Sequence, residues 1–76
     1  MSESEWLDIF GSNLSNMLKK AGFTQRELAE ETELSEATIS SYINSRKLPG
    51  IKAIINIAYA LDCSVDDLVD FGEMIQ

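Results

Sequence analysis

Apolar side chains recur along this chain at steps of three and four residues, the spacing that places them on one face of an α-helix. No stretch alternates between apolar and polar positions in the way a half-buried strand does. The first apolar row comprises Leu7, Phe10, Leu14, Met17 and Leu18. The pattern therefore predicts an all-α protein, with its core built from the apolar faces of helices.

Capping residues place the ends of five predicted helices, at about residues 5–20, 24–32, 35–44, 51–61 and 64–71. Gly22 ends the first helix, because glycine readily adopts the left-handed conformation that follows a helix. Thr24 and Glu27 have the spacing of a capping box, in which each side chain accepts the other residue's free backbone N–H. Ser35 is a favourable N-cap for the third helix.

A loop at residues 45–50 precedes the last two helices. Pro49 restricts the residue before it to extended conformations, which argues against helix at that point. The fourth helix is expected to bury Ile54, Ile57, Ala58 and Leu61. Ser64 and Asp67 form a second capping box at the start of the fifth helix. That helix is expected to bury Val65, Leu68, Val69 and Phe71.

The second and third helices are separated by only a few residues, so they must cross steeply, as in a helix-turn-helix. Such a crossing needs a small residue on the second helix, and Ala29 occupies that place. The apolar contacts of the pair are assigned to Leu28, Leu34, Ile39 and Tyr42. The opposite face of the third helix carries Glu36, Ala37, Ser40, Ser41 and Asn44. Short polar and methyl-bearing side chains allow a helix to approach base edges closely.

The 76 residues are expected to form one domain, 1–76, and their composition argues against several kinds of chemistry. There is no His and only one Cys, which excludes a Cys/His zinc site, and no Gly-rich nucleotide-binding motif is present. Cys63 has no His to activate it and follows an apolar helical pattern, so it is assigned to the core. We therefore expect no enzyme activity, no metal and no cofactor.

The predicted location is the cytoplasm, with the DNA and away from membranes. No apolar run approaches the roughly 18 residues of a membrane span. The acidic start of the chain is unlike a signal peptide, and a lone cysteine cannot close an internal disulfide, which fits a reducing compartment.

Taken together, the order and spacing of these residues resemble those of the XRE or Cro/repressor-like helix-turn-helix family, which includes the lambdoid phage repressors. The matching residues span about positions 8 to 71 and are Phe10-Gly11, Leu14, Lys19, Gly22-Phe23-Thr24-Gln25, Glu27-Leu28-Ala29, Leu34-Ser35, Thr38-Ile39-Ser40, Tyr42, Asn44, Pro49, Ile54, Ala58, Ala60-Leu61, Ser64 and Asp67-Leu68. The resemblance implies a five-helix bundle that binds palindromic operator DNA as a symmetric dimer and regulates transcription.

By position, the resemblance makes residues 35–44 the recognition helix, lying in the major groove. It assigns base contacts to Glu36, Ala37, Ser40 and Ser41. It assigns phosphate contacts, which set register without reading sequence, to Gln25, Ser35, Asn44, Arg46 and Lys47.

Three positions depart from the family pattern. Glu33 stands at the turn position where many members have Gly, and a left-handed conformation there costs about 1 kcal/mol. Leu18 and Ile43 stand where members often pair an Arg with a Glu, so an apolar contact would replace the ion pair. Glu36 can accept a hydrogen bond from cytosine N4, but its carboxylate also faces the phosphates.

The net charge of −7 is unusual for a DNA-binding protein, but the charges are unevenly distributed. All six basic residues lie between positions 19 and 52 together with five of the thirteen acidic ones, so this segment carries +1 and the rest −8. Between Ala37 and Leu61 there are three basic residues and no acidic one. We expect the field near the end of the third helix to be positive, and DNA binding to be weaker and more salt-sensitive than in a basic homologue.

Two features at the ends of the chain allow other interpretations. Acidic and hydroxyl side chains have the spacing of a calcium-binding loop at Asp62, Ser64, Asp66, Asp70 and Glu73. Asp67 occupies the position that such a loop gives to Gly, and the apolar residues between fit a buried helix face better. Core and partner-binding roles are equally compatible with Trp6 and the tail residues Phe71, Met74 and Ile75.

The alternative function is a protein-interaction module on the same fold, such as an antitoxin or an antirepressor. Its support is the acidic balance of the chain and the apolar residues at both ends.

Overall fold

The computed structural model describes residues 2–70, which form five helices and no strand. The helices are α1 (Glu3–Ala21), α2 (Gln25–Thr32), α3 (Glu36–Ile43), α4 (Ile51–Ala60) and α5 (Val65–Leu68). The predicted all-α class is confirmed, and the bounds of α2, α3 and α4 agree with the predicted ones to within one residue at each end. The prediction for the fifth helix was too long, since α5 ends at Leu68; Phe71 lies outside the described residues.

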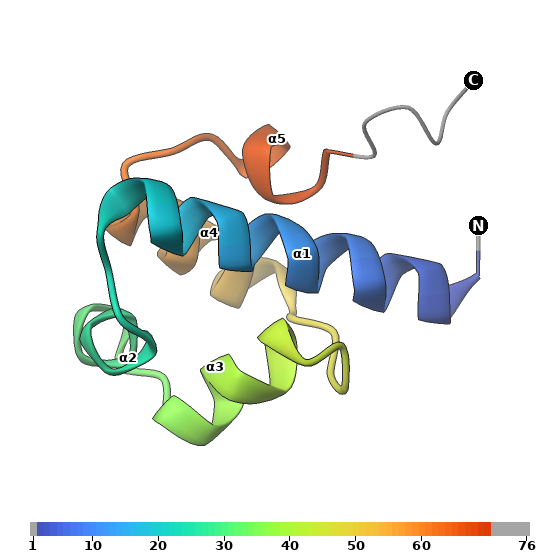
Figure 1. Cartoon of the computed structure of the whole chain (residues 1–76), viewed down its shortest axis with the longest axis horizontal. Helices are drawn as coiled ribbons and strands as arrows, with labels where there is room; N and C mark the ends of the chain where they lie inside the picture. Colours follow the sequence, from blue (N-terminus) through green and yellow to red (C-terminus); the bar gives the residue numbers. More distant parts are fainter. Residues whose placement is uncertain (1, 71–76) are drawn as a thin grey trace.

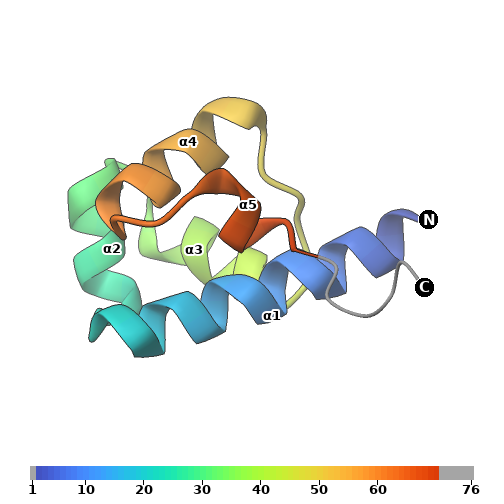
Figure 2. The same ribbon diagram turned by 90° about the horizontal axis from the view of Figure 1, so that it is seen from above.

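The long helix α1 lies across the molecule, with α2 and α3 on one side of it and α5 on the other (Figure 1). α1 packs against α3 and α5, α2 packs against α3 and α4, and α4 also packs against α5. Seen from above, α1 and α4 lie on opposite sides and α5 rests on both (Figure 2). This arrangement leaves one face of α3 uncovered by any other helix.

Each helix contributes one fully buried aliphatic side chain to the core, namely Leu14, Leu28, Ile39, Ile57 and Leu68. Around them, Phe10 of α1 packs edge-on against Tyr42 of α3, with ring centroids 5.8 Å apart. Burial raises the pKa of the Tyr42 hydroxyl. Of the predicted row on α1, Phe10, Leu14 and Leu18 are buried, whereas Leu7 and Met17 are half-buried. The predicted face of the first helix is therefore confirmed.

Side chains cap the starts of four helices. Thr24 Oγ1 accepts the Glu27 N–H at 3.1 Å and Glu27 Oε1 accepts the Thr24 N–H at 2.9 Å, which confirms the predicted capping box. Ser64 and Asp67 form the second predicted box at α5, and the Ser35 hydroxyl accepts the Thr38 N–H at the start of α3. These reciprocal bonds satisfy backbone N–H groups that have no partner within the helix.

The predicted start of the first helix, at residue 5, was wrong by two residues. Ser2 Oγ accepts the Glu5 N–H at 3.3 Å, and Glu5 Oε1 accepts the Ser2 N–H at 3.0 Å. This third capping box starts α1 at Glu3. The S-x-x-E signal is present in the sequence, and the prediction missed it because residues 1–5 were interpreted only as an acidic terminus.

Four residues adopt positive φ angles between the helices. Gly22 (φ 73°) and Glu33 (φ 61°) end α1 and α2 in the left-handed conformation, as predicted. Ser45 (φ 59°) and Asp62 (φ 53°) are also left-handed after α3 and α4, where no sequence signal predicted it. A left-handed residue reverses the chain within a few positions and so permits the short connections of this fold.

Asn13 of α1 fixes the position of α5, 55 residues further along the chain. Its side-chain Nδ2 donates to the backbone oxygen of Leu68 at 3.0 Å and to that of Asp70 at 2.9 Å. These bonds satisfy carbonyls at the end of a helix of only four residues. Within residues 2–70, no helix has the length and apolar character needed to cross a membrane.

Candidate functional site

The turn between α2 and α3 is held by the buried hydroxyl of Thr32. Its Oγ1 donates to the carbonyl oxygen of Leu28 at 2.8 Å and accepts the N–H of Leu34 at 3.4 Å. Glu33, between them, reverses the chain in the left-handed conformation. The helical pattern placed Thr32 only at the end of the second helix, so its role in the turn was not predicted. The only available signal was its position beside a turn, which does not distinguish a buried hydroxyl from an exposed one.

α3 has one buried face and one accessible face. Ile39 and Tyr42 are buried, as the helix-turn-helix pattern predicted. On the other side, Glu36 and Ala37 are exposed, while Ser40 and Ser41 are half-buried. The structure thus brings the four residues predicted to contact bases together on one surface that no other helix covers (Figure 1).

Hydrogen bonds orient several polar side chains of this surface. Asn44 Nδ2 donates to the carbonyl oxygen of Ser40 at 2.9 Å and to its Oγ at 3.1 Å. Because that Oγ already accepts a hydrogen bond, its own O–H is left to donate outward. At the other end of α3, Ser35 Oγ lies 2.8 Å from Thr38 Oγ1 and accepts the Thr38 N–H.

The remaining predicted phosphate-contacting residues flank this surface. Gln25 is the first residue of α2 and is half-buried, and Arg46 and Lys47 are exposed in the segment that follows α3. The Arg46 N–H donates to the carbonyl oxygen of Ser41 at 2.8 Å, so the chain stays close to α3 as it leaves the helix. The basic pair therefore lies at the C-terminal end of α3, as the sequence implied.

The end of α3 is placed by a close crossing with α1 at Gly11. A Cβ atom added to Gly11 would lie 2.7 Å from the carbonyl oxygen of Tyr42 and 2.8 Å from that of Ile43. Real Cβ atoms do not come this close to backbone oxygens. Gly11 therefore sets how closely the C-terminal end of α3 approaches α1, and with it the position of Arg46 and Lys47.

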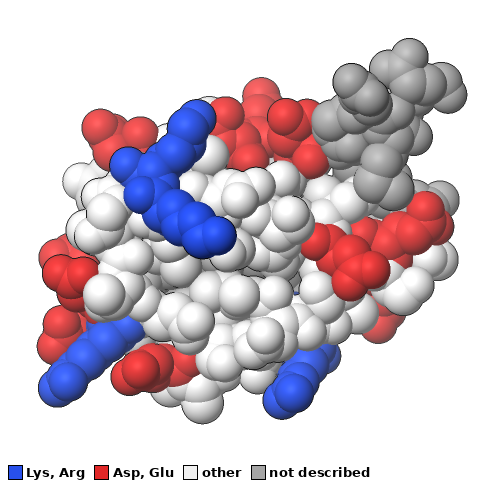
Figure 3. All heavy atoms as spheres, in the orientation of Figure 1, with Lys and Arg blue, Asp and Glu red and all other residues white. Residues whose placement is uncertain are grey.

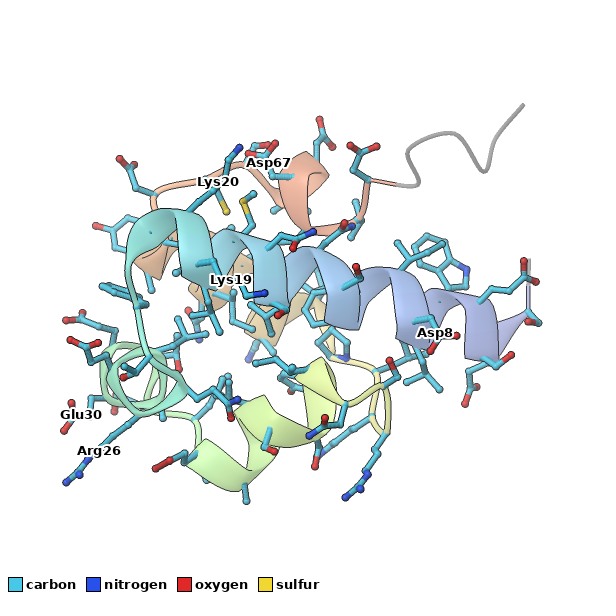
Figure 4. All side chains as sticks on the ribbon, in the orientation of Figure 1. Asp8, Lys19, Lys20, Arg26, Glu30 and Asp67 are labelled. Carbon is cyan, nitrogen blue, oxygen red and sulfur yellow. The ribbon has the colours of Figure 1, made fainter. Side chains whose placement is uncertain are left out.

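Charge is distributed around this site as the sequence predicted. The surface over α3 is mostly uncharged, with basic side chains on either side and one acidic group near its left end (Figure 3). Acidic side chains gather instead over α5 and near the start of α1 (Figures 1 and 3). Figure 4 shows Arg26 beside Glu30 on α2, and Lys20 with Asp67 on the side of α1 away from α3. Acidic side chains also lie over α2, at the left of Figure 3, next to basic ones, so the acidic surplus lies mainly over α5 and near the start of α1.

The other candidate residues, namely those with calcium-loop spacing and Cys63, have structural roles. Among residues 2–70, no three acidic or Cys side chains are grouped to hold a metal ion. Of the residues with calcium-loop spacing, Ser64 caps α5 together with Asp67 and Asp66 lies in its first turn, whereas Asp62 and Asp70 lie before and after the helix. Glu73 lies outside the described residues. Cys63 is half-buried against the core, and burial, followed by the nearby carboxylates of Asp67 and Asp62, raises the pKa of its thiol. A raised thiol pKa disfavours the nucleophilic thiolate.

Trp6 is half-buried at the edge of a shallow hollow of about 260 Å³, which Phe10, Leu48, Pro49, Ile54 and Val69 also line. This places Trp6 between the two predicted alternatives, since it is neither fully in the core nor fully exposed. Phe71, Met74 and Ile75 lie outside the described residues.

Comparison with known protein families identifies one match over most of the chain. The model of the Cro/C1-type HTH DNA-binding domain matches residues 13–73. No match is found among curated protein sequences.

Solved structures with the same fold include the clp gene regulator ClgR from Corynebacterium glutamicum, at 28% identity and a TM-score of 0.79, covering 83% of this chain and 67% of that one. An HTH_3 family transcriptional regulator from Vibrio cholerae is 21% identical with a TM-score of 0.84, covering 88% of this chain and 38% of that one. The restriction-modification controller protein C.AhdI from Aeromonas hydrophila is 24% identical with a TM-score of 0.78, covering 82% of this chain and 94% of that one. The latter two similarities concern the fold, and the chain spans well under half of the Vibrio protein.

Proposed function

Since this chain belongs to the Cro/C1-type helix-turn-helix DNA-binding domain family, we propose that it regulates transcription by binding a specific duplex sequence with α3 in the major groove. Its family and fold are those of DNA-binding regulators rather than enzymes. The observation that carries the proposal is the accessible face of α3, whose short side chains lie opposite the buried Ile39 and Tyr42.

Base reading is assigned to Glu36, Ala37, Ser40 and Ser41. Ser40 is the best oriented of them, because its Oγ accepts from Asn44 and its O–H is left to donate to an acceptor such as guanine O6 or thymine O4. The Ala37 methyl group is exposed and suits apolar contact with a thymine methyl group. Glu36 is expected to accept from cytosine N4 and to select against other bases at that position.

Phosphate contacts are assigned to Gln25, Ser35, Asn44, Arg46 and Lys47. Arg46 and Lys47 should contribute most, since both are exposed and cationic. Asn44 and Ser35 should contribute less, because both already hydrogen-bond within the protein. Gln25 lies at the N-terminus of α2, where backbone N–H groups and the helix dipole favour an anion.

The proposed active form is a homodimer on a palindromic operator. A two-fold protein presents the same face of α3 to two half-sites, which doubles the contacts made by an 8-residue helix. This function would place the protein in the cytoplasm with the DNA.

The test is a fluorescence-polarisation titration of the protein against a random duplex library and the sequences enriched from it, at two salt concentrations. A dimer that neutralises about six to eight phosphates should give a log–log salt slope of about −5 to −7. An enriched palindrome with this slope would support the proposal. Absence of binding at low salt would reject it.

Three variants distinguish residues that contact bases from residues that contact phosphates. Ser40→Ala and Ser41→Ala should relax the preference at one base pair each, at a cost of about 1–3 kcal/mol on the best sequence. Lys47→Ala should weaken all sequences alike and reduce the steepness of the salt slope by about 1. Lys20→Ala is the matched control, because Lys20 lies on the side of α1 away from α3 (Figure 4) and should leave both quantities nearly unchanged.

A second candidate function is an antitoxin or antirepressor that acts by binding another protein. It is favoured by large apolar side chains that remain exposed on and before α4. It predicts that α3 substitutions leave activity intact while apolar substitutions elsewhere abolish a partner complex.

A further inference from the structure

The exposed large apolar side chains found among residues 2–70 all lie between positions 48 and 59. They are Leu48 (39% exposed), Ile51 (67%), Ile55 (52%) and Tyr59 (88%). Ile51, Ile55 and Tyr59 follow one another at four-residue steps on α4 and therefore form a continuous row, here called the α4 stripe.

The face of α4 that carries Ile57 is already in the core, and Ala58, seven residues after Ile51 and therefore beside it on the helix surface, is buried where the two faces meet. Only Lys52 and Asn56 are polar among the ten residues of this helix. A helix that is apolar on nearly all sides is normally buried on all sides. Among residues 2–70, the α4 stripe is thus the surface with the most apolar area left for a partner to cover.

Charge favours a second copy of this chain as that partner. The chain carries a net charge of −7, so most pairs of its surfaces would bring carboxylates together. No Asp or Glu occurs between Ala37 and Leu61, a segment that includes the whole of α4. Two copies can therefore meet at the α4 stripe without burying a single carboxylate from either helix.

The stripe is also self-complementary. With Ile55 at its centre, an antiparallel copy of α4 places Ile51 against the partner's Tyr59, and the two-fold axis repeats the same contact on the other side.

We propose that the chain forms a two-fold dimer through the α4 stripe, with the two α4 helices antiparallel. The nine residues from Ile51 to Tyr59 span about 12 Å, so the interface is small and the dimer is weak in the absence of DNA. This inference deepens the proposed function, because it names the surface that forms the dimer.

The position of α4 agrees with simultaneous binding of two half-sites. α4 lies at the side of the molecule opposite α1 in Figure 2, whereas α3 lies on the side away from α5 in Figure 1. A two-fold axis beside α4, parallel to the direction from α5 to α3, leaves both α3 helices free on the same side of the dimer. DNA with two half-sites would therefore reinforce the weak contact.

The test is sedimentation equilibrium of the full chain without DNA, over about 1 to 500 μM, the range in which a small interface is populated. The wild-type mass should rise with concentration toward twice the monomer mass of 8.5 kDa. Ile55→Asp should raise the dissociation constant at least about tenfold, because it places two carboxylates together on the axis. Asn16→Asp, an exposed change on α1 that gives the same net charge, should leave it unchanged.

Tyr59→Gln provides a second variant that does not depend on Ile55, since Tyr59 is 88% exposed and its loss does not affect the core. Circular dichroism establishes that each variant is folded. A wild-type protein that stays monomeric over the whole range overturns the proposal, and so does a dimer that neither variant weakens.

Titrations with DNA keep this inference distinct from the proposed function. A duplex holding a single half-site should bind Ile55→Asp as tightly as wild type, whereas the full palindrome should bind it less tightly. If wild type dimerises through the stripe but binds neither duplex, the dimer stands and the proposed function fails. If wild type and Ile55→Asp bind the palindrome equally tightly, the proposed function stands and the proposed dimer fails.

Discussion

Gly11 of α1 and Tyr42 of α3 are so close that a Cβ atom on the first would lie 2.7 Å from the carbonyl oxygen of the second. The two helix backbones therefore meet without an intervening side chain. Phe10, the residue before Gly11, makes the edge-on aromatic contact with the same tyrosine. The crossing sets the position of the last turn of α3, which the proposed phosphate-binding residues follow.

Replacement of Gly11 by Ala should destabilise the protein by about 1–3 kcal/mol, the cost of overpacking a well-packed contact. This loss of stability is expected even though alanine is more favourable than glycine in a helix interior, by about 1 kcal/mol. Urea unfolding measures the loss. Ser12→Ala, at the next and exposed position, is the control and should be neutral or slightly stabilising. A Gly11→Ala protein as stable as wild type would show that α1 and α3 separate without cost.

Replacement of Thr32 by Val should cost about 1–3 kcal/mol of stability, because the shape is kept while the Leu34 N–H loses its acceptor. Thr32→Ser retains the hydroxyl and should cost less, mainly for the lost methyl group. Thermal or urea unfolding of the two variants compares them. Equal losses would assign the role of Thr32 to its methyl group and would contradict the proposed hydrogen-bonded turn.

Two substitutions of Glu33 separate the effect of backbone strain from the effect of charge at the turn between α2 and α3. Glu33→Gly relieves a left-handed side chain at φ 61° and should raise stability relative to Glu33→Gln by about 0.5–1 kcal/mol, after the entropic cost of glycine. Both variants remove one negative charge, so both should bind DNA slightly more tightly at low salt. A glutamine variant as stable as the glycine variant would mean that the backbone there is not strained.

The capping box of α2 should make stability depend on acidic pH. Backbone and side-chain hydrogen bonds from Thr24 lower the pKa of Glu27 from its usual value of 4.5. The folded protein therefore holds the carboxylate more strongly than the unfolded chain does. This stabilisation is complete above the unfolded pKa and is lost as pH falls through the lower, folded pKa.

Glu27→Gln should accordingly flatten the decline in stability between neutral pH and pH values below about 4.5, as followed by urea unfolding. An unchanged slope in Glu27→Gln would contradict the assignment. Glu5, whose pKa is lowered by hydrogen bonds from Ser2, should contribute in the same direction.

The sequence by itself determined the features that depend on neighbours three or four residues away. The boxes at Thr24 and Ser64 and the buried face of α3 were predictable, because a cap or a helix face is formed within one or two turns of the same chain. The start of α1 at Glu3, after its N-cap Ser2, was predictable for the same reason, but residues 1–5 were interpreted only as an acidic terminus. The left-handed turn at Glu33 was expected from the family resemblance instead.

Tertiary structure decided the features that need a second element. Asn13 donates to carbonyls 55 and 57 residues away, and Gly11 is confined by the backbone of another helix. Periodicity predicted the buried face of α4, and Ile57, Ala58 and Leu61 are buried as expected, but the packing of the neighbouring helices leaves Ile54 half-buried and leaves Ile55 and Tyr59 exposed. Apolar spacing shows which residues share a helix face, whereas the burial of that face depends on where the chain places the other helices.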